Sequence, residues 1–360
     1  PYRRQRRMCI RDSQNVKATF VGRKLTGSES SEAKITSFII DDEAVVEQPV
    51  INEEAGTIVF AVNEEVESLK FTPIIEISEG ATITPASGVA QDFSNNKKVT
   101  YTVTAEDGTV KVYTAFVEGT RKVLKYSFED WKEGSKNDEL LPKDLWAGSA
   151  AGAGILGGTL LRKETREDGT YAAKLITFEY PNEPNSLVPK ITAGSIFIGK
   201  FDMMPALQGD RLSCTKFGLD AETVSLGGKP LCFKGVYKYE SGSNYLDASN
   251  YEDVKPVDIK DKGQIQAVLY KVQTGEDGKE IVLTGHDVNT SELRVAVANI
   301  IVEDIKEYTP FNIEFEYLQE YDRNAKYKFA IVCSSSKDGD LFKGAGGSTL
   351  IVDEFEVICE

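Results

Sequence analysis

Short runs in which apolar and polar residues alternate recur along most of the chain. In residues 99–104, Val-Thr-Tyr-Thr-Val-Thr, every second side chain is apolar, which is the period of a strand with one buried and one solvated face. Threonine, valine, isoleucine, tyrosine and phenylalanine fill these runs, and the spacing of an amphipathic helix is nearly absent. The pattern predicts an all-β protein.

The expected strands fall into two groups, the first of which occupies residues 34–121. Its five expected strands cover residues 35–40, 57–62, 69–77, 98–105 and 110–118. Glycines and prolines separate them, and the pair Asp107-Gly108 is a hairpin signal because both positions tolerate positive φ. Short strands at this spacing predict a small immunoglobulin-like sandwich.

Residues 125–360 form the larger expected domain. Its ten expected strands cover residues 125–131, 172–178, 195–202, 230–239, 264–272, 280–283, 293–301, 311–317, 326–333 and 349–358. Strands of this number, joined by loops, suit a double-sheet jelly roll. The chain has 360 residues, of which 41% are hydrophobic and 28% charged, as in a soluble globular protein with a sizeable core.

The first 33 residues lie outside both expected domains. Residues 8–13, Met-Cys-Ile-Arg-Asp-Ser, resemble the translation of a transposon sequencing adapter, so we interpret residues 1–13 as non-native. Such a segment would hide a signal peptide or a lipid-anchor motif at the native start. Residues 14–33 are interpreted as a polar linker.

The charge balance excludes several partners and several chemistries. The formal net charge is −15, so nucleic acid is not an expected partner, because phosphate neutralisation needs clustered Lys and Arg. An acidic surface is compatible with neutral sugars and with divalent cations. The single histidine, His286, excludes a His-rich zinc site and is a poor basis for a Ser-His-Asp device, because it lies in a turn-like stretch.

Four cysteines lie in the expected domains: Cys214, Cys232, Cys333 and Cys359. Each is in or beside an apolar run, and no two have the Cys-x-x-Cys spacing of a metal or redox motif. We expect buried free thiols, although a disulfide remains an alternative. No apolar run reaches the ~18–20 residues of a membrane helix.

Two sets of motifs resemble known families. Residues 77–93 and 99–109 are similar to the immunoglobulin-like spacer domains of gut-bacterial surface lipoproteins. The segments Tyr126-Ser-Phe-Glu-Asp-Trp131 and Phe311-Asn-Ile-Glu-Phe-Glu-Tyr317, with residues 334–355, resemble the putative carbohydrate metabolism domain family of bacterial surface lipoproteins. Further matching segments lie in the same order across residues 125–360.

This resemblance implies a jelly roll like that of carbohydrate-binding modules, and it does not supply an activity. It also implies a secreted protein, held at the cell surface or in the periplasm as a lipoprotein whose only tie to the membrane is its lipid anchor. Glycan is the implied partner, with other glycan-utilisation surface proteins as further possible partners.

Aromatic side chains are the sugar-binding candidates, because an exposed ring can stack on the apolar face of a pyranose. Trp146 precedes Gly148 in a loop-like segment, so we expect its ring to be exposed. Tyr237 and Tyr239 fall on one face of their strand. Tyr245 and Tyr251 lie in a polar loop rich in Asn, whose amide can bond to sugar hydroxyls. For each tyrosine, a packing role is the alternative.

A metal site is predicted from two carboxylates. By strand alternation Asp353 shares a face with Ile351 and Phe355, and a carboxylate on an apolar face needs hydrogen-bond donors or a cation. Glu129 lies in the first strand of the same domain, and the first and last strands of jelly rolls often run side by side. We therefore expect Glu129 and Asp353 to hold a structural Ca²⁺. Pairing of Asp353 with a backbone N–H or with Lys125 is the alternative.

Other motifs carry less chemistry. Residues 152–157 fit G-x-G-x-x-G, but they lack the preceding buried strand and the following helix of a dinucleotide site. Asp338-Gly339-Asp340 suits a turn, with a second cation site as the weaker alternative. No pair of acidic residues has the pattern of a jelly-roll glucanase, and we name no catalytic residue.

These observations favour a non-catalytic surface protein that binds or captures glycan for polysaccharide use. One alternative is a carbohydrate-active enzyme, a hydrolase or lyase, with a carboxylate pair in the jelly-roll groove. Another is a structural or adhesive surface protein whose larger domain binds a protein through a broad apolar patch.

Overall fold

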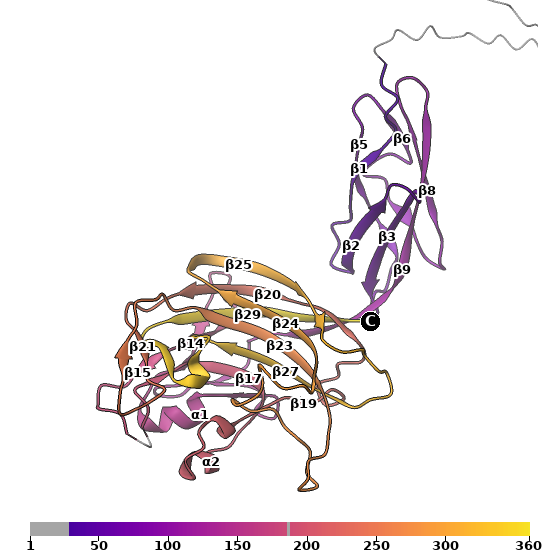
Figure 1. Ribbon diagram of the computed structural model, residues 1–360. Coiled ribbons are helices and arrows are strands. Elements are labelled where there is room, and N and C mark those ends of the chain that lie inside the picture. Colours follow the sequence, from indigo (N-terminus) through magenta and orange to yellow (C-terminus); the bar gives the residue numbers. More distant parts are fainter. Residues whose placement is uncertain (1–28, 186–187) are drawn as a thin grey trace, which may run out of the picture. The chain divides into compact units, whose positions relative to one another are not determined.

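The computed structural model describes residues 29–185 and 188–360, and these divide into two compact units. The first unit extends to Gly119, and the second comprises Thr120–Glu360 together with Asn63–Glu65. The regular elements of both units are almost all strands (Figure 1), so the predicted all-β class is confirmed. The segment interpreted as non-native, and the linker up to residue 28, lie outside the described residues.

The first unit is a small sandwich. Its strands are β1 (Ile35–Ile39), β2 (Val45–Asn52), β3 (Thr57–Asn63), β4 (Lys70–Phe71), β5 (Ile74–Ile77), β6 (Thr82–Thr84), β7 (Gln91–Asp92), β8 (Val99–Thr104) and the first part of β9 (Val110–Tyr126). Strands β8 and β9 form an antiparallel hairpin, in which Gly108 has φ +91°. Tyr101 of β8 is fully buried beside Phe38, as the alternation of this strand predicts.

The second unit consists of two facing sheets. Its strands are β10 (Trp131–Lys132), β11 (Glu139–Leu140), β12 (Trp146–Gly148), β13 (Leu161–Thr165), β14 (Tyr171–Ile176), β15 (Phe178–Glu179), β16 (Ile191–Thr192), β17 (Ser195–Phe201), β18 (Thr215–Phe217), β19 (Leu219–Asp220), β20 (Pro230–Glu240), β21 (Tyr245–Asp247), β22 (Lys255–Pro256), β23 (Gly263–Lys271), β24 (Arg294–Val302), β25 (Ile305–Glu314), β26 (Glu316–Tyr317), β27 (Tyr327–Ser334), β28 (Lys343–Ala345) and β29 (Thr349–Cys359).

The two sheets of the second unit are built from different strands. One sheet runs β12-β17-β27-β23-β24-β26, and the other places β14 and β20 on either side of β29, with β25 beyond β20. Figure 1 shows them as two stacked layers. The helices are single turns, α1 (Ala150–Ala153) and α2 (Met204–Leu207), with 3₁₀ turns at Gly154–Leu156, Leu212–Cys214 and Gly339–Leu341. Within the described residues, none is long enough or apolar enough to cross a membrane.

The main core lies between the two sheets and follows strand alternation. In β23, Ile265, Ala267 and Leu269 point into this core, whereas Gln266 and Val268 point to the opposite face of the sheet. That opposite face is itself covered by loops, so a second, smaller core forms there. The sheet that contains β23 is therefore buried on both faces. The face that points away from the main core also carries polar side chains.

The last strand of the larger unit lies beside the first strand of the same unit. Strand β29 pairs with the end of β9 from Phe355 opposite Tyr126 to Cys359 opposite Lys122. The ring of Phe128 contacts the ring of Phe355, with centroids 5.1 Å apart. The expected neighbourhood of the first and last strands is thus observed. All four cysteines of the described residues are free thiols, which agrees with the sequence expectation.

A β-bulge in β29 overturns the face predicted for Asp353. Leu350 and Val352 point into the main core before the bulge, and Phe355 and Val357 point into it afterwards. The register with β20 shifts between Lys234 and Val236, and Glu354 has φ +54°. Asp353 therefore does not share a face with Phe355, because the extra residue inverts the alternation at this point.

Candidate functional site

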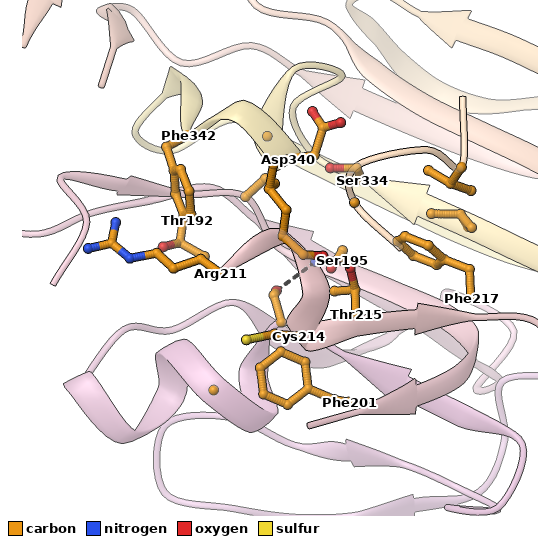
Figure 2. A pocket seen from close by; sticks show the side chains of 18 of the residues that line it. Thr192, Ser195, Phe201, Arg211, Cys214, Thr215, Phe217, Ser334, Asp340 and Phe342 are labelled. Atoms are coloured by element: carbon orange, nitrogen blue, oxygen red, sulfur yellow. Dashed lines mark hydrogen bonds between the residues drawn. The ribbon is translucent and has the colours of Figure 1, made fainter. Parts of the chain in front are cut away.

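One concavity of the larger unit is a cleft on the outer face of the β17–β27–β23 layer. Its cavity volume is about 200 Å³. The floor comes from Gln264 and Gln266 of β23 with Val332 of β27, and the walls come from loops far apart in the sequence. Figure 2 shows side chains from these loops converging on one space. The sheet gives the cleft a rigid floor, and the loops supply its chemistry.

One wall carries an aromatic ring on an unusual backbone. Phe342 ends the 3₁₀ turn Gly339–Leu341 with φ +58° and ψ +36°, the left-handed conformation that bulky residues seldom adopt. The Arg211 guanidinium lies 5.2 Å from the centre of this ring, and its Nη2 donates to the Asn185 carbonyl at 2.9 Å. The half-buried ring of Phe342 therefore lies on the cleft wall, and the Arg211 guanidinium lies over one face of this ring.

The floor presents a buried amide. Gln266 is only 3% exposed, and its Nε2 donates to Asn289 Oδ1 at 3.1 Å. Among the described residues, its Oε1 has no hydrogen-bond donor. This oxygen is not one of the fully buried side-chain atoms that lack a partner, so it can be reached from the cleft. This oxygen is therefore suited to a ligand hydroxyl.

A carboxylate also lines the cleft. Asp340 is half-buried, and Oδ1 accepts a hydrogen bond from the Leu341 backbone N–H at 3.0 Å. Burial raises the pKa of the Asp340 carboxyl, and the nearby charge of Asp338 raises it further. The sequence predicts that Asp340 lies in a turn, and the structure also places it on the cleft wall.

The loop that carries Asp340 and Phe342 is fixed at both ends by one buried carboxylate. Asp261 Oδ2 accepts hydrogen bonds from Ser336 Oγ at 2.6 Å, from the Ala345 N–H at 2.8 Å and from Ser348 Oγ at 2.7 Å. Burial raises the pKa of the Asp261 carboxyl, although these hydrogen bonds oppose that shift. Ser336 precedes the cleft residues and Ala345 follows them, so Asp261 closes the base of the loop.

Three of the five predicted sugar-binding aromatics are buried, so the exposure expected for Trp146 is wrong and the packing alternative describes Tyr239 and Tyr245. Trp146 belongs to strand β12, is 6% exposed and packs on Phe128, because its strand turns the ring toward the core. Tyr239 donates to the Ser335 carbonyl at 3.0 Å, and Tyr245 donates to Asp338 Oδ2 at 3.1 Å.

The remaining two tyrosines differ from each other. Tyr237 does share the core-facing side of β20 with Tyr239, and its half-buried ring packs toward Phe311. Tyr251 is 39% exposed and is the one predicted aromatic whose ring faces solvent to that extent. The prediction that Tyr237 and Tyr239 share one face of their strand is correct, but that face points into the core and is not a sugar-binding surface.

The predicted calcium ligands have protein partners. Arg166 Nη1 lies 2.5 Å from Asp353 Oδ2 and also pairs with Glu354, while its guanidinium stacks over the Tyr308 ring. Glu129 Oε1 accepts a hydrogen bond from the backbone N–H of Tyr171 at 3.1 Å. In the described part of the chain, no three His, Cys, Asp or Glu side chains come together as a metal site. The calcium site stays a prediction.

Sequence reasoning missed most of the residues that meet in the cleft. Arg211, Gln266, Asn289 and Phe342 come from separate loops and strands, and no motif connects them. One signal was available for Gln266: it follows Gln264 by two residues inside a run that is otherwise apolar, so both amides fall on the same face of a buried strand. Polar residues at such positions need partners.

The fold and the cleft define a β-sandwich protein with a cleft on one of its sheets, and comparison with known proteins identifies the family. Residues 105–358 match the family described as putative carbohydrate metabolism domain, and residues 35–117 match the N-terminal domain of surface glycan-binding proteins. The chain therefore belongs to the putative carbohydrate metabolism domain family, as the sequence motifs indicated.

Two solved structures are similar over most of the chain. The first is described as a putative glycoside hydrolase from Bacteroides thetaiotaomicron; it is 30% identical, with 94% of this chain and 99% of that chain covered and a TM-score of 0.57. The second, described as a putative glycoside hydrolase from Bacteroides vulgatus, is 28% identical, with 66% and 98% covered and a TM-score of 0.54. Among curated proteins, no sequence matches this chain.

Proposed function

We propose that this protein is a non-catalytic surface protein that binds glycan in the cleft over β17, β23 and β27. The single observation that supports this best is the combination of Phe342 on the cleft wall with the donor-free amide oxygen of Gln266 on the floor. A sugar ring has an apolar C–H face for the aromatic ring and hydroxyls for the amide. The family relationship supports a carbohydrate as the ligand.

The left-handed backbone at Phe342 supports a binding role for this ring. Strained conformations of about 1–3 kcal/mol persist where the surrounding structure enforces them, and they cluster at ligand sites. Asp261 supplies that enforcement by holding Ser336 and Ala345 at the two ends of the loop. The aromatic ring is thus preorganised, which lowers the entropy lost when a ligand binds.

Replacing Phe342 by Ala is expected to weaken glycan binding about tenfold or more, because stacking on an aromatic ring contributes about 1–3 kcal/mol. Affinity electrophoresis on a panel of polysaccharides, followed by calorimetry on the best ligand, measures this. Leu341→Ala is the matched control, since Leu341 is the adjacent residue, is 45% exposed and does not line the cleft. Equal affinities of both variants and the parent would place the glycan elsewhere.

A hydrolase is the second candidate function, and Asp340 is the observation that favours it. Its carboxyl has a raised pKa and lines the cleft, as a general acid would. Retaining and inverting glycosidases need a second carboxyl about 5–10 Å away, and a substrate-bound structure would show whether Asp338 can move into that place. Release of reducing sugar that is abolished by Asp340→Asn would establish this alternative.

The setting of the protein follows from the same proposal. We propose a lipoprotein at the cell surface, where the first unit acts as a spacer and neighbouring glycan-utilisation proteins share the captured glycan. The match of residues 35–117 to the N-terminal domain of surface glycan-binding proteins supports a location outside the cytoplasm. Exposed Tyr251 remains part of the proposed binding surface, and Glu129 with Asp353 remains the proposed calcium site.

A further inference from the structure

Two amide side chains meet in the cleft and share one hydrogen bond. Gln266 Nε2 donates to Asn289 Oδ1 at 3.1 Å, and both residues line the cleft. Gln266 is almost fully buried, whereas Asn289 is exposed. In the described part of the chain no other side-chain hydrogen bond involves these amides, so Gln266 Oε1 can accept from a ligand and Asn289 Nδ2 can donate to it. Rotation of both amides by half a turn exchanges these roles and again offers one acceptor and one donor.

Apolar side chains adjoin this amide pair. Val332 is the cross-strand partner of Gln266 in the β23–β27 pair, so their Cβ atoms lie about 5 Å apart on one face of the sheet. Val288 is buried and directly precedes Asn289 in the chain. Val288, Val332 and Phe217 all belong to the smaller core, and all three line the cleft (Figure 2). The acceptor and the donor therefore border an apolar surface that a ligand can reach.

A sugar unit that carries hydroxyls alone does not match this combination. Its hydroxyls can bond to either amide, but a hydroxyl that faces Val288 or Val332 loses water and gains no partner. A 6-deoxy or O-acetyl sugar brings a methyl group but no N–H. An acetamido group has a methyl group, an N–H donor and a carbonyl acceptor in one planar unit. These three parts match the apolar surface, Gln266 Oε1 and Asn289 Nδ2.

We propose that the cleft binds N-acetylated amino sugars through their acetamido groups. This inference rests on the proposed glycan-binding function and names its substrate class. The acetamido N–H donates to Gln266 Oε1, the carbonyl accepts from Asn289 Nδ2, and the methyl group packs on Val288 and Val332. The ring of Phe342 stays available for the C–H face of the sugar. A sugar with a hydroxyl in place of the acetamido group loses the methyl contact and the matched pair of hydrogen bonds together.

The experiment compares sugars that differ only in the acetamido group. Chitotetraose, the tetramer of N-acetylglucosamine, is matched with cellotetraose, which has the same linkage and length. The methyl glycosides of N-acetylgalactosamine and N-acetylmannosamine are matched with those of galactose and mannose. Calorimetry on the full chain is expected to show at least about tenfold tighter binding of the acetamido sugar in one or more pairs, from one buried methyl group and one additional hydrogen bond.

Two substitutions test the amide pair. Asn289→Ala removes the donor, and Gln266→Met removes the acceptor while it keeps the length of the side chain. Each is expected to lower the ratio of the two affinities about fivefold, because each removes one hydrogen bond to the acetamido group. Asn324→Ala, at an exposed asparagine outside the cleft, should leave the ratio unchanged. Because Asn289 is exposed, Asn289→Ala keeps the fold and decides the test even if Gln266→Met does not fold.

The possible outcomes separate the two levels of the proposal. Equal affinities within every pair, or tighter binding of glucuronate oligomers than of every acetamido sugar, overturn the ligand class and leave glycan binding intact. An unchanged affinity ratio in Asn289→Ala does the same. Binding to none of these sugars, together with no binding to polysaccharides in affinity electrophoresis, overturns the proposed function and this inference with it. Circular dichroism and the thermal midpoint of each variant confirm that the compared proteins are folded.

Discussion

Asp261→Ala is expected to lower the free energy of unfolding of the larger unit by about 3 kcal/mol, because the loss of one carboxylate leaves several buried donors unpaired. Ser336 and Ser348 are fully buried, as is Ala345, whose backbone N–H is the third donor. Asp261→Asn retains one acceptor oxygen and should lose less. Equilibrium denaturation with urea measures the difference.

The same substitution should also free the loop that carries Asp340 and Phe342. Amide hydrogen exchange of residues 337–344 is expected to accelerate by more than exchange in the strands, because both ends of this loop lose their common acceptor. Asp258→Ala is the control, since this exposed residue lies three positions away in the same connection. If Asp261→Ala lowers the free energy of unfolding by only about 0.5 kcal/mol or less, the size usual for surface substitutions, the role given to Asp261 is contradicted.

Phe355→Ala is expected to cost about 3–5 kcal/mol, the range for removal of a phenylalanine ring from a packed core. The ring of Phe355 is fully buried, and its centroid lies 5.1 Å from that of Phe128 and 5.0 Å from that of Phe233. These contacts join the last strand to the segment that follows β9 and to the neighbouring strand β20, so the ring closes the sandwich.

The measurement is the unfolding transition of the larger unit in the full chain. Phe355→Leu keeps most of the apolar volume and should lose clearly less stability than Phe355→Ala. Leu318→Ala, at a position that is 46% exposed, should change the transition by about 0.5 kcal/mol or less. If Phe355→Ala and Leu318→Ala change the free energy of unfolding equally, the Phe355 ring does not close the core.

The positions of the strands could be read from the sequence because alternation is a local property. In residues 99–104 successive side chains point to opposite faces whatever lies beyond them, and by the same rule Gln264 and Gln266, two residues apart in β23, share one face. The bulge at Glu354 could not be read, because one extra residue on a strand leaves no pattern until its partner strand is known. That single residue reversed the predicted face of Asp353.

The sequence by itself determined the all-β class, the two-part organisation and the carbohydrate-associated family, since these depend on period, punctuation and motifs along one chain. Only the tertiary structure decided which face of each strand is covered by the second sheet, and so which aromatics are core. It placed Trp146 and Tyr239 in the interior and brought Gln266 and Phe342 into one cleft. The physical reason is that burial and site geometry arise from contacts between segments distant in sequence, which no local pattern encodes.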